Sequence, residues 1–308
     1  MNIVYLKYAI EVAKTGSINK AAENLYVAQP NLSRAIKELE SSLGITIFQR
    51  TSKGMTLTPD GESLLQYSKS VLNQLDQIEE MFQKGQPNKQ SFSISVPRAT
   101  YISYAFAQFS KHIDENRPAE FFYKETNALR AINNVIDADY RLGIIRYAAK
   151  YDKYFKEMLE EKGLNYELVT EFTYSLIMNR ESLLNDVEDI RFDNLKEYIE
   201  IAHADPFVPS IPLSKVKKEE LPDDIDKRIF VFERASQFDI LSANPDTFMW
   251  VSPIPQPILD KYELVQRSCS ENTKTYKDVL IYKKDYKLTK LDKAFITELC
   301  EAKRSYIK

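Results

Sequence analysis

The chain has 308 residues, enough for two or three domains that each bury a core of their own. With 44% hydrophobic and 28% charged residues it has the composition of a globular protein, and no window approaches the ~18 consecutive apolar residues of a membrane span. The first 58 residues carry seven Lys and Arg against four Glu, a charge of +3, so the remaining 250 carry −6. A basic N-terminal segment on an acidic body indicates that one end of the chain meets a polyanion.

Three short helical patterns follow one another in the first 44 residues. The first ends at Gly16, and Ser17 is placed to cap a second helix over about residues 18–25. After a turn over residues 26–28, Pro30 lies near the first turn of a third helix. This helix has an i, i+4, i+7, i+11 apolar stripe, which is Leu32, Ile36, Leu39 and Leu43. The short helix, turn and third helix have the proportions of a helix-turn-helix motif.

The third helix carries amide, hydroxyl and cationic side chains on its opposite face. These groups suit base edges and phosphates in a DNA major groove, although an isolated polar helix face is more often simply solvated. The next residues alternate like two strands around a turn at Ser52, Lys53 and Gly54, which predicts a β-hairpin wing with Arg50 and Lys53 near its tip. The helix and wing together favour a DNA-binding surface made of Gln29, Pro30, Asn31, Ser33, Arg34, Lys37, Arg50, Ser52 and Lys53.

The segment GSINKAAENLYVAQPNLSRAIKELESSLGITIFQRTSKGMTLTPDG, residues 16–61, resembles the DNA-binding domain of LysR-type transcription regulators nearly position by position. The resemblance implies that Gln29, Pro30, Ser33, Arg34 and Lys37 lie on the recognition helix and residues 50–53 on the wing. Ala28 departs from the pattern, because the family often has Ser there, and a cap or phosphate contact from that hydroxyl is absent. The family implies binding to double-stranded promoter DNA, a homodimer or homotetramer, contact with RNA polymerase, and a small-molecule effector.

A long helix is predicted after the wing. Thr58 is a plausible N-cap, Pro59 occupies the first helical position, and the pattern continues to about Lys84 before Gly85 and Pro87. Apolar residues recur every seven positions with an offset of four, which gives a narrow seam suited to a partner helix. The alternative is that the seam packs on its own domain, whereas the family dimerises through this helix. The expected dimerisation residues are Leu64, Val71, Leu75, Ile78 and Phe82.

The remaining residues predict an α/β effector domain over residues 91–308. Residues 92–147 alternate β-α-β-α-β, which favours a parallel doubly wound sheet, and a second such unit begins near Glu167. The resemblance implies two lobes like those of a periplasmic binding protein. The expected boundaries are 1–58 for the winged helix-turn-helix, 59–90 for the linker helix and hinge, 91–165 with 266–308 for the first lobe, and 166–265 for the second. Many tyrosines and only two glycines follow residue 91, so the cleft is expected to be aromatic.

An anionic metabolite is the expected effector, bound beyond the carboxyl ends of three strands of the first lobe. Hydroxyl, amide and guanidinium groups follow these strands, two of them at helix N-termini, and would suit a carboxylate. The alternative is that Arg146 pairs with Glu125 as a structural bridge and that Thr100 is only a helix cap. The expected effector-binding residues are Arg98, Thr100, Thr126, Asn127 and Arg146.

Catalytic and metal-binding patterns are absent from the sequence. The two histidines, His112 and His203, are far apart, and the two cysteines, Cys269 and Cys300, favour a cytoplasmic protein with reduced thiols and without a redox switch. A loop beginning at Asp205-Pro206 lies at the mouth of the expected cleft, although turn chemistry explains it equally well. We therefore expect no enzyme activity, no metal and no cofactor. The competing hypotheses are an architectural DNA-binding protein and an enzyme fused to a DNA-binding module.

Overall fold

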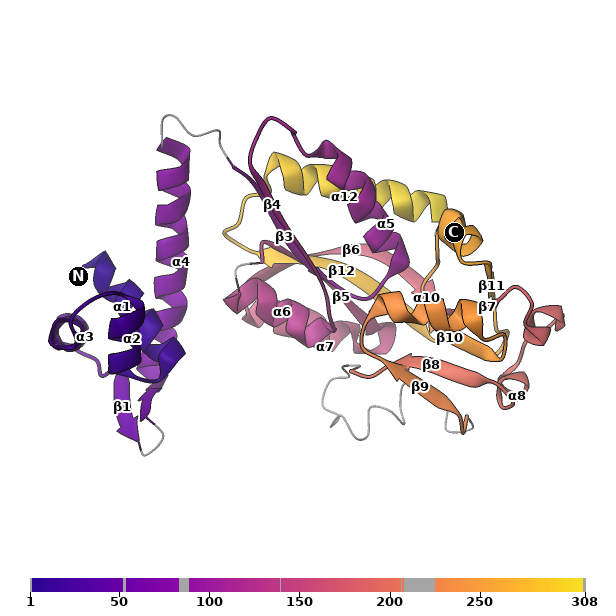
Figure 1. Cartoon of the computed structure of the whole chain (residues 1–308), viewed down its shortest axis with the longest axis horizontal. Helices are drawn as coiled ribbons and strands as arrows, with labels where there is room; N and C mark the ends of the chain where they lie inside the picture. Colours follow the sequence, from indigo (N-terminus) through magenta and orange to yellow (C-terminus); the bar gives the residue numbers. More distant parts are fainter. Residues whose placement is uncertain are drawn as a thin grey trace. The chain divides into compact units, whose positions relative to one another are not determined.

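The structure is a computed structural model that describes residues 2–51, 54–82, 89–138, 140–205, 207 and 225–306. It separates into two compact units, residues 1–88 and residues 89–308. Figure 1 shows the helices and strands of both units. In the part of the chain that the structure describes, every helix is too short or too polar to cross a membrane.

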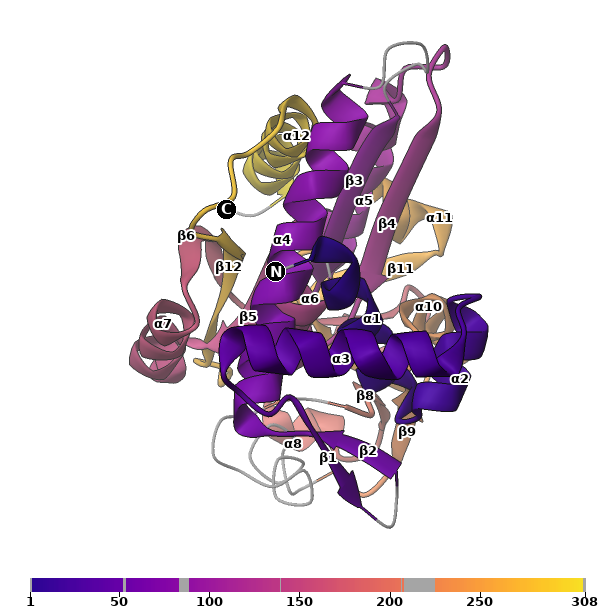
Figure 2. The same ribbon diagram turned by 90° about the vertical axis from the view of Figure 1, so that its left-hand side faces the viewer.

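The N-terminal unit is a winged helix-turn-helix followed by a long helix. Its elements are α1 (Ile3–Thr15), α2 (Ile18–Asn24), α3 (Gln29–Leu43), β1 (Phe48–Thr51), β2 (Gly54–Leu57) and α4 (Pro59–Phe82). Figure 2 shows the three short helices and the hairpin gathered around one end of α4. The predicted boundary signals are confirmed: Gly16 ends α1 with φ 62°, the Ser17 hydroxyl accepts from the Lys20 N–H at 3.4 Å, and the Thr58 hydroxyl accepts from the Gly61 N–H at 3.0 Å.

The core of this unit joins all four helices and the hairpin. Leu6, Ala9 and Val12 of α1 and Leu32, Ile36 and Leu39 of α3 are buried together, with Leu65 and Leu72 of α4. The predicted stripe on α3 is wrong at its last position, because Leu43 lies in the final turn of the helix and is 37% exposed. The helix α4 ends at Phe82 in the structure, and the predicted residues 83–84 lie outside the described residues.

The C-terminal unit has two lobes, each built on a five-stranded sheet. Lobe I is residues 89–173 with 275–306, and lobe II is residues 175–267 of the described chain. The strand orders are β4-β3-β5-β12-β6 in lobe I and β11-β7-β10-β8-β9 in lobe II. The elements of lobe I are β3 (Gln90–Val96), α5 (Thr100–Phe109), η1 (Ser110–His112), β4 (Ala119–Glu125), α6 (Ala128–Asp137), β5 (Leu142–Ala148), η2 (Ala149–Tyr151), α7 (Asp152–Glu161), β6 (Leu164–Thr173), β12 (Thr275–Lys283) and α12 (Lys290–Tyr306). The elements of lobe II are β7 (Ser175–Asn179), η3 (Leu183–Asp186), α8 (Phe192–Leu195), β8 (Ile199–His203), β9 (Arg228–Val231), α10 (Arg234–Ala243), β10 (Thr247–Val251), α11 (Gln256–Lys261) and β11 (Leu264–Arg267).

Helices cover both faces of the lobe I sheet, as the alternation of elements predicts. The helices α5 and α12 lie side by side on one face, and α6 and α7 lie on the other (Figure 1). Between α5, α12 and the sheet, an aromatic cluster includes Phe92 and Phe109, whose ring centroids are 4.6 Å apart. Such pairs add stability beyond the area they bury. A well-packed core on both faces holds the strand ends of lobe I in fixed positions.

The structure differs from the predicted C-terminal topology in two respects. The sheets are mixed, because β12 returns antiparallel between β5 and β6, and β7 and β11 run antiparallel to their neighbours in lobe II. The predicted lobe boundaries at 165 and 266 are also displaced. Strand β6 continues to Thr173 because it pairs with β12 along its length, and β11 pairs with β7 to Arg267. The helix α7 and the strands β6 and β11 were not predicted.

Candidate nucleic-acid interface and ligand cleft

The polar face of α3 is directed away from the core of the N-terminal unit. Gln29, Pro30, Asn31, Arg34 and Lys37 are exposed, and Ser33 is partly buried. The reason is the helical period, since the buried positions 32, 35, 36 and 39 occupy the opposite side. The N-cap residue Ala28 makes no side-chain cap, so the expected loss of a capping hydroxyl is confirmed. The exposed amide and cationic groups at the start of α3 are therefore available to a ligand.

The hairpin β1–β2 is fixed to the helices by backbone contacts. The Met55 N–H donates to the Gly16 carbonyl at 2.9 Å, and a Cβ at Gly54 would lie 2.6 Å from the same oxygen. The carboxylate of Glu40 on α3 accepts from the Ile47 N–H at 2.8 Å. At the start of α4, a Cβ at Gly61 would lie 2.2 Å from the Ile47 carbonyl oxygen, so only glycine fits there.

Beside these contacts is a shallow open hollow, and the predicted residues Gln29 and Arg50 both line it. Gln29 comes from the start of α3, and Arg50 is an exposed residue of β1 opposite Met55. The hollow is also lined by Ser17, Asn19 and Lys20, which the sequence analysis did not select. The predicted wing residues Ser52 and Lys53 lie outside the described residues. An amide, a hydroxyl and two cations around one hollow suit a phosphate backbone beside the recognition helix.

The expected dimerisation seam on α4 is divided between two environments. Leu64 and Leu75 pack partly against the core of their own unit, as the alternative reading proposed, together with the buried residues Leu65 and Leu72. Val71 is 39% exposed, and the neighbouring Tyr67 is 73% exposed. The side chains of Ile78 and Phe82 lie outside the described residues.

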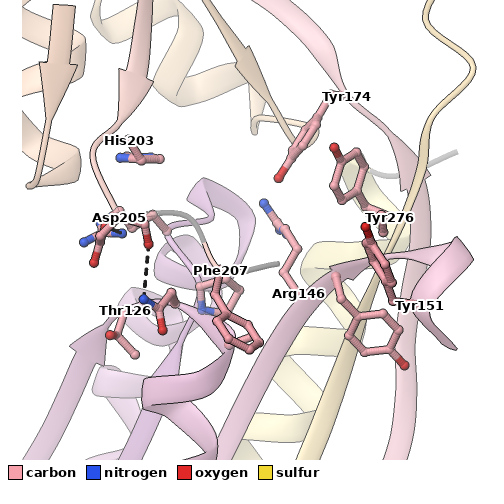
Figure 3. Close-up of a pocket in the computed structure, with 14 residues that line it drawn as sticks. Thr126, Arg146, Tyr151, Tyr174, His203, Asp205, Phe207 and Tyr276 are labelled. Atoms are coloured by element: carbon pink, nitrogen blue, oxygen red, sulfur yellow. Dashed lines mark hydrogen bonds and ion pairs between the residues drawn. The ribbon is translucent and has the colours of Figure 1, made fainter. Parts of the chain in front are cut away.

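The C-terminal unit has a cavity of about 150 Å³ between its two lobes. Four of the five predicted effector residues line it, namely Arg98, Thr126, Asn127 and Arg146. The fifth, Thr100, does not: it is buried in the first turn of α5 without capping the helix, because the N-cap position belongs to Ala99. The wall is aromatic as expected, and its aromatic side chains are Tyr147, Tyr151, Tyr174, Phe207 and Tyr276. Figure 3 shows Arg146 between Tyr174 and Tyr276 on one side and Phe207 on the other.

Arg146 is bound to a carboxylate other than the one proposed from sequence. Its Nε and Nη2 donate to the two oxygens of Asp278 at 2.7 and 2.6 Å, and the Tyr101 hydroxyl donates to the same carboxylate at 2.6 Å. Asp278 is fully buried and lies directly opposite Arg146 in the β5–β12 register. Burial by itself would lower the pKa of Arg146, but the charge and hydrogen bonds of Asp278, together with Tyr174 and Tyr101, outweigh it and raise that pKa above its ordinary value. The guanidinium also lies over the Phe172 ring at 4.7 Å.

The predicted alternative, an ion pair between Arg146 and Glu125, is wrong. Glu125 lies at the end of β4, which is separated from β5 by β3. Its Oε1 instead accepts from Arg234 Nε of α10 at 2.7 Å. The idea of a structural bridge at Arg146 is nevertheless correct, with Asp278 as the partner.

Lobe II contributes two polar residues to the cavity that the sequence analysis did not assign to the site. Asp205, from the loop noted at the cleft mouth, accepts from Arg98 at 2.8 Å and from Arg130 at 3.0 Å. His203, at the end of β8, has a buried Nδ1 with no hydrogen-bond partner in the described structure. Burial, and next to it the positive charge of Arg98, lowers the pKa of His203 to about 4. The imidazole is therefore neutral near pH 7.

The fold and these two sites define a winged helix-turn-helix joined to a two-lobed α/β domain. Residues 3–62 match the family model for the bacterial regulatory helix-turn-helix protein, lysR family. Two regulators of Bacillus subtilis are similar: the uncharacterized HTH-type regulator YcgK is 39% identical over 101 residues (32% of this chain, 31% of the relative), and YofA is 49% identical over 74 residues (24% and 26%). These matches span about a third or less of the relatives' length.

Solved structures match the full length of the chain. Full-length OxyR from Pseudomonas aeruginosa has a TM-score of 0.62 at 14% identity, and covers 100% of this chain and 98% of its own. Full-length LysG from Corynebacterium glutamicum with bound effector arginine has a TM-score of 0.59 at 14% identity, with both chains fully covered. Full-length CbnR in complex with its target DNA has a TM-score of 0.56 at 14% identity, with 98% and 100% covered. Residues 3–62 therefore match the lysR-family helix-turn-helix domain, and the chain as a whole has the fold of these full-length regulators.

Proposed function

We propose that the protein is an effector-responsive, sequence-specific DNA-binding transcription regulator. The observation that carries the proposal is the exposed polar face of α3, where Gln29, Arg34 and Lys37 are displayed beside the wing residue Arg50. Amide and guanidinium groups on a helix that fits the major groove read base edges, and cations on a wing contact phosphates. The regulator has promoter DNA and RNA polymerase as its partners and acts in the cytoplasm without a cofactor, a metal or catalytic activity.

The test is DNA binding by the full chain across a range of salt concentrations, on the region upstream of its gene and on random DNA. A regulator should prefer the upstream fragment and should change its affinity or footprint when one metabolite of a screened set is added. An architectural protein would bind both DNAs equally and ignore every metabolite. Equal affinity for the two fragments in all conditions would contradict the proposal.

A homodimer or homotetramer formed through α4 completes the proposal. Val71 and Tyr67 leave apolar surface on one side of this helix, while Leu65 and Leu72 hold the other side to its own unit. Val71→Asp would place a charge in the partner interface and should convert the dimer to a monomer at micromolar concentration. Sedimentation velocity measures this, with Lys69→Ala, an exposed position on the same helix, as the control. A Val71→Asp protein that stays dimeric would place the interface elsewhere.

We further propose that the cavity between the lobes binds the small-molecule effector. Its position beyond the ends of β3, β4 and β8, its aromatic wall and its few convergent polar groups support this role. In the LysG structure the bound effector is arginine. That observation applies to LysG, and we do not propose arginine as the effector of this chain.

A further inference from the structure

Ion pairs connect the lobes at two places in the described part of the C-terminal unit, and only one of these places belongs to the cavity. At the first, Asp205 of lobe II is bound by Arg98 and Arg130 of lobe I, and its backbone carbonyl accepts from the Asn127 side chain at 3.1 Å. At the second, a single pair joins Glu125 of lobe I to Arg234 of lobe II at 2.7 Å. Neither residue of this second pair lines the cavity.

The cavity end that holds Asp205 has more positive than negative charge. Asp205 is the one acidic residue among the described residues that line the cavity; its carboxylate accepts from two guanidinium groups, and its backbone carbonyl accepts from Asn127, the N-cap of α6. The side chains of Arg98 and Asp205 are 12% and 11% exposed, so their interaction is only weakly screened by solvent. A buried arginine needs an anion, and here the protein supplies one from its own chain.

The rest of the cavity wall is largely aromatic. Tyr147, Tyr174 and Phe207 are among the residues that line it, and Arg146 beside Tyr174 already has its charge balanced by Asp278. A ligand that fits both halves has one negative group toward Arg98 and an apolar body toward the aromatic wall.

We propose that Asp205 is an internal ligand of this cavity, and that the effector is a small carboxylate with an apolar or aromatic body that displaces the Asp205 carboxylate from Arg98 and Arg130. This inference rests on the proposed effector role of the cavity. The exchange forms no covalent bond: one carboxylate replaces another on the same guanidinium groups. It releases both ion pairs of Asp205 between the lobes and leaves the Glu125–Arg234 pair intact, so effector binding changes how the lobes hold each other. The apparent affinity of the wild type is therefore the intrinsic affinity multiplied by the fraction of molecules in which Asp205 has left the site.

The experiment is calorimetric titration of the full chain with benzoate, with benzamide as the uncharged analogue. Asp205→Asn removes the competing charge and should tighten benzoate binding roughly tenfold or more, with no gain for benzamide. Glu125→Gln is the matched control, because it makes the same chemical change in the ion pair outside the cavity, and should leave the affinity near the wild-type value. Adding Arg98→Ala to Asp205→Asn should abolish the gain.

A second variant tests the same site by rescue. Asp205→Ala leaves Arg98 buried without its anion, so the midpoint of thermal unfolding should fall, and acetate should raise it more than in the wild type while acetamide does not. The inference is overturned if Asp205→Asn binds benzoate no more tightly than the wild type, if Glu125→Gln gains equally, or if acetate stabilises both proteins alike. DNA binding measured in parallel separates the two proposals. Specific DNA binding without carboxylate exchange refutes only the internal ligand, whereas exchange in a chain that does not bind DNA refutes the regulator.

Discussion

The proposed DNA-binding surface and the cleft satisfy their charges in opposite ways. On α3 and the hairpin, Arg34, Lys37 and Arg50 are exposed, and within the described part of the chain they have no ion pair. In the cleft, Arg98 and Arg146 are each bound to a carboxylate of the same chain at 2.8 Å or less. A cation left in water gains from meeting a polyanion, because counterions are released. A cation that is already paired with a carboxylate of the protein must first lose that partner before it can bind another anion.

Substitutions in the two sites should therefore have different effects. Loss of an exposed cation should remove one proposed contact with DNA and leave the fold unchanged, because surface charges contribute little to stability. Loss of one member of a buried pair leaves an uncompensated charge in the interior. Substitutions of similar size should therefore affect affinity in the first unit and stability in the second.

The largest effect is expected for Asp278→Asn. This substitution leaves the guanidinium of Arg146 buried without its counterion and should lower the free energy of unfolding of the C-terminal unit by about 3–5 kcal/mol. The exposed pair Lys89–Glu120 provides the control, because Lys89→Ala should cost at most about 1 kcal/mol. Chemical denaturation measures both. A stable Asp278→Asn protein would show that the Arg146 pair is dispensable, and would restore Arg146 as a candidate for direct effector contact.

The next effect is a dependence of stability on pH through His203. Its pKa is lowered to about 4 in the folded protein from an ordinary value of 6.5. As the pH falls below 6.5 the unfolded chain binds the proton first, so the folded state should lose up to about 3 kcal/mol between pH 6.5 and pH 4 and keep its stability above that range. Denaturation at a series of pH values should show this slope in the wild type and a flatter one in His203→Gln. Identical slopes would contradict the assignment to His203.

The smallest effects are expected on the DNA-facing surface, and they are effects on affinity. Arg34→Ala should weaken binding to the preferred DNA by about 1–3 kcal/mol and relax the preference at one base position. Arg50→Ala should weaken specific and random DNA alike and reduce the salt dependence, as expected for a phosphate contact. Fluorescence anisotropy across salt concentrations separates the two patterns. Unchanged affinity in both variants would remove the helix and wing from the interface.

The N-terminal unit was predictable because its signals act over a few residues. Gly16, Ser17, Pro30 and Thr58 each mark an element boundary within one helical turn, and the structure confirms each boundary. Leu43 was the exception on α3, since burial at the end of a helix depends on what lies beyond it, and helical spacing carries no information about that neighbour.

In the C-terminal unit most strands were predictable, but β6, β11 and several side-chain partners were not. Arg146 and Asp278 are 132 positions apart and meet only because β12 returns antiparallel beside β5. No local pattern specifies that return, so the alternative considered from the sequence paired Arg146 with Glu125, which is closer along the chain. His203 and Asp205 were not assigned to the site for a related reason. They reach the cavity from the second lobe, and the only signal was the Asp-Pro loop that follows β8.

The hairpin base has a consequence for engineering the protein. It is held to α1 by the bond between Met55 and Gly16 and to α4 by the close approach of Gly61 to Ile47. The exposed strand residues Gln49 and Arg50 take no part in these two anchors, so their charge and size are open to redesign while both anchors stay in place. A library varied at these two positions would give a set of proteins that share one α3 helix and differ in the charge that the hairpin presents beside it.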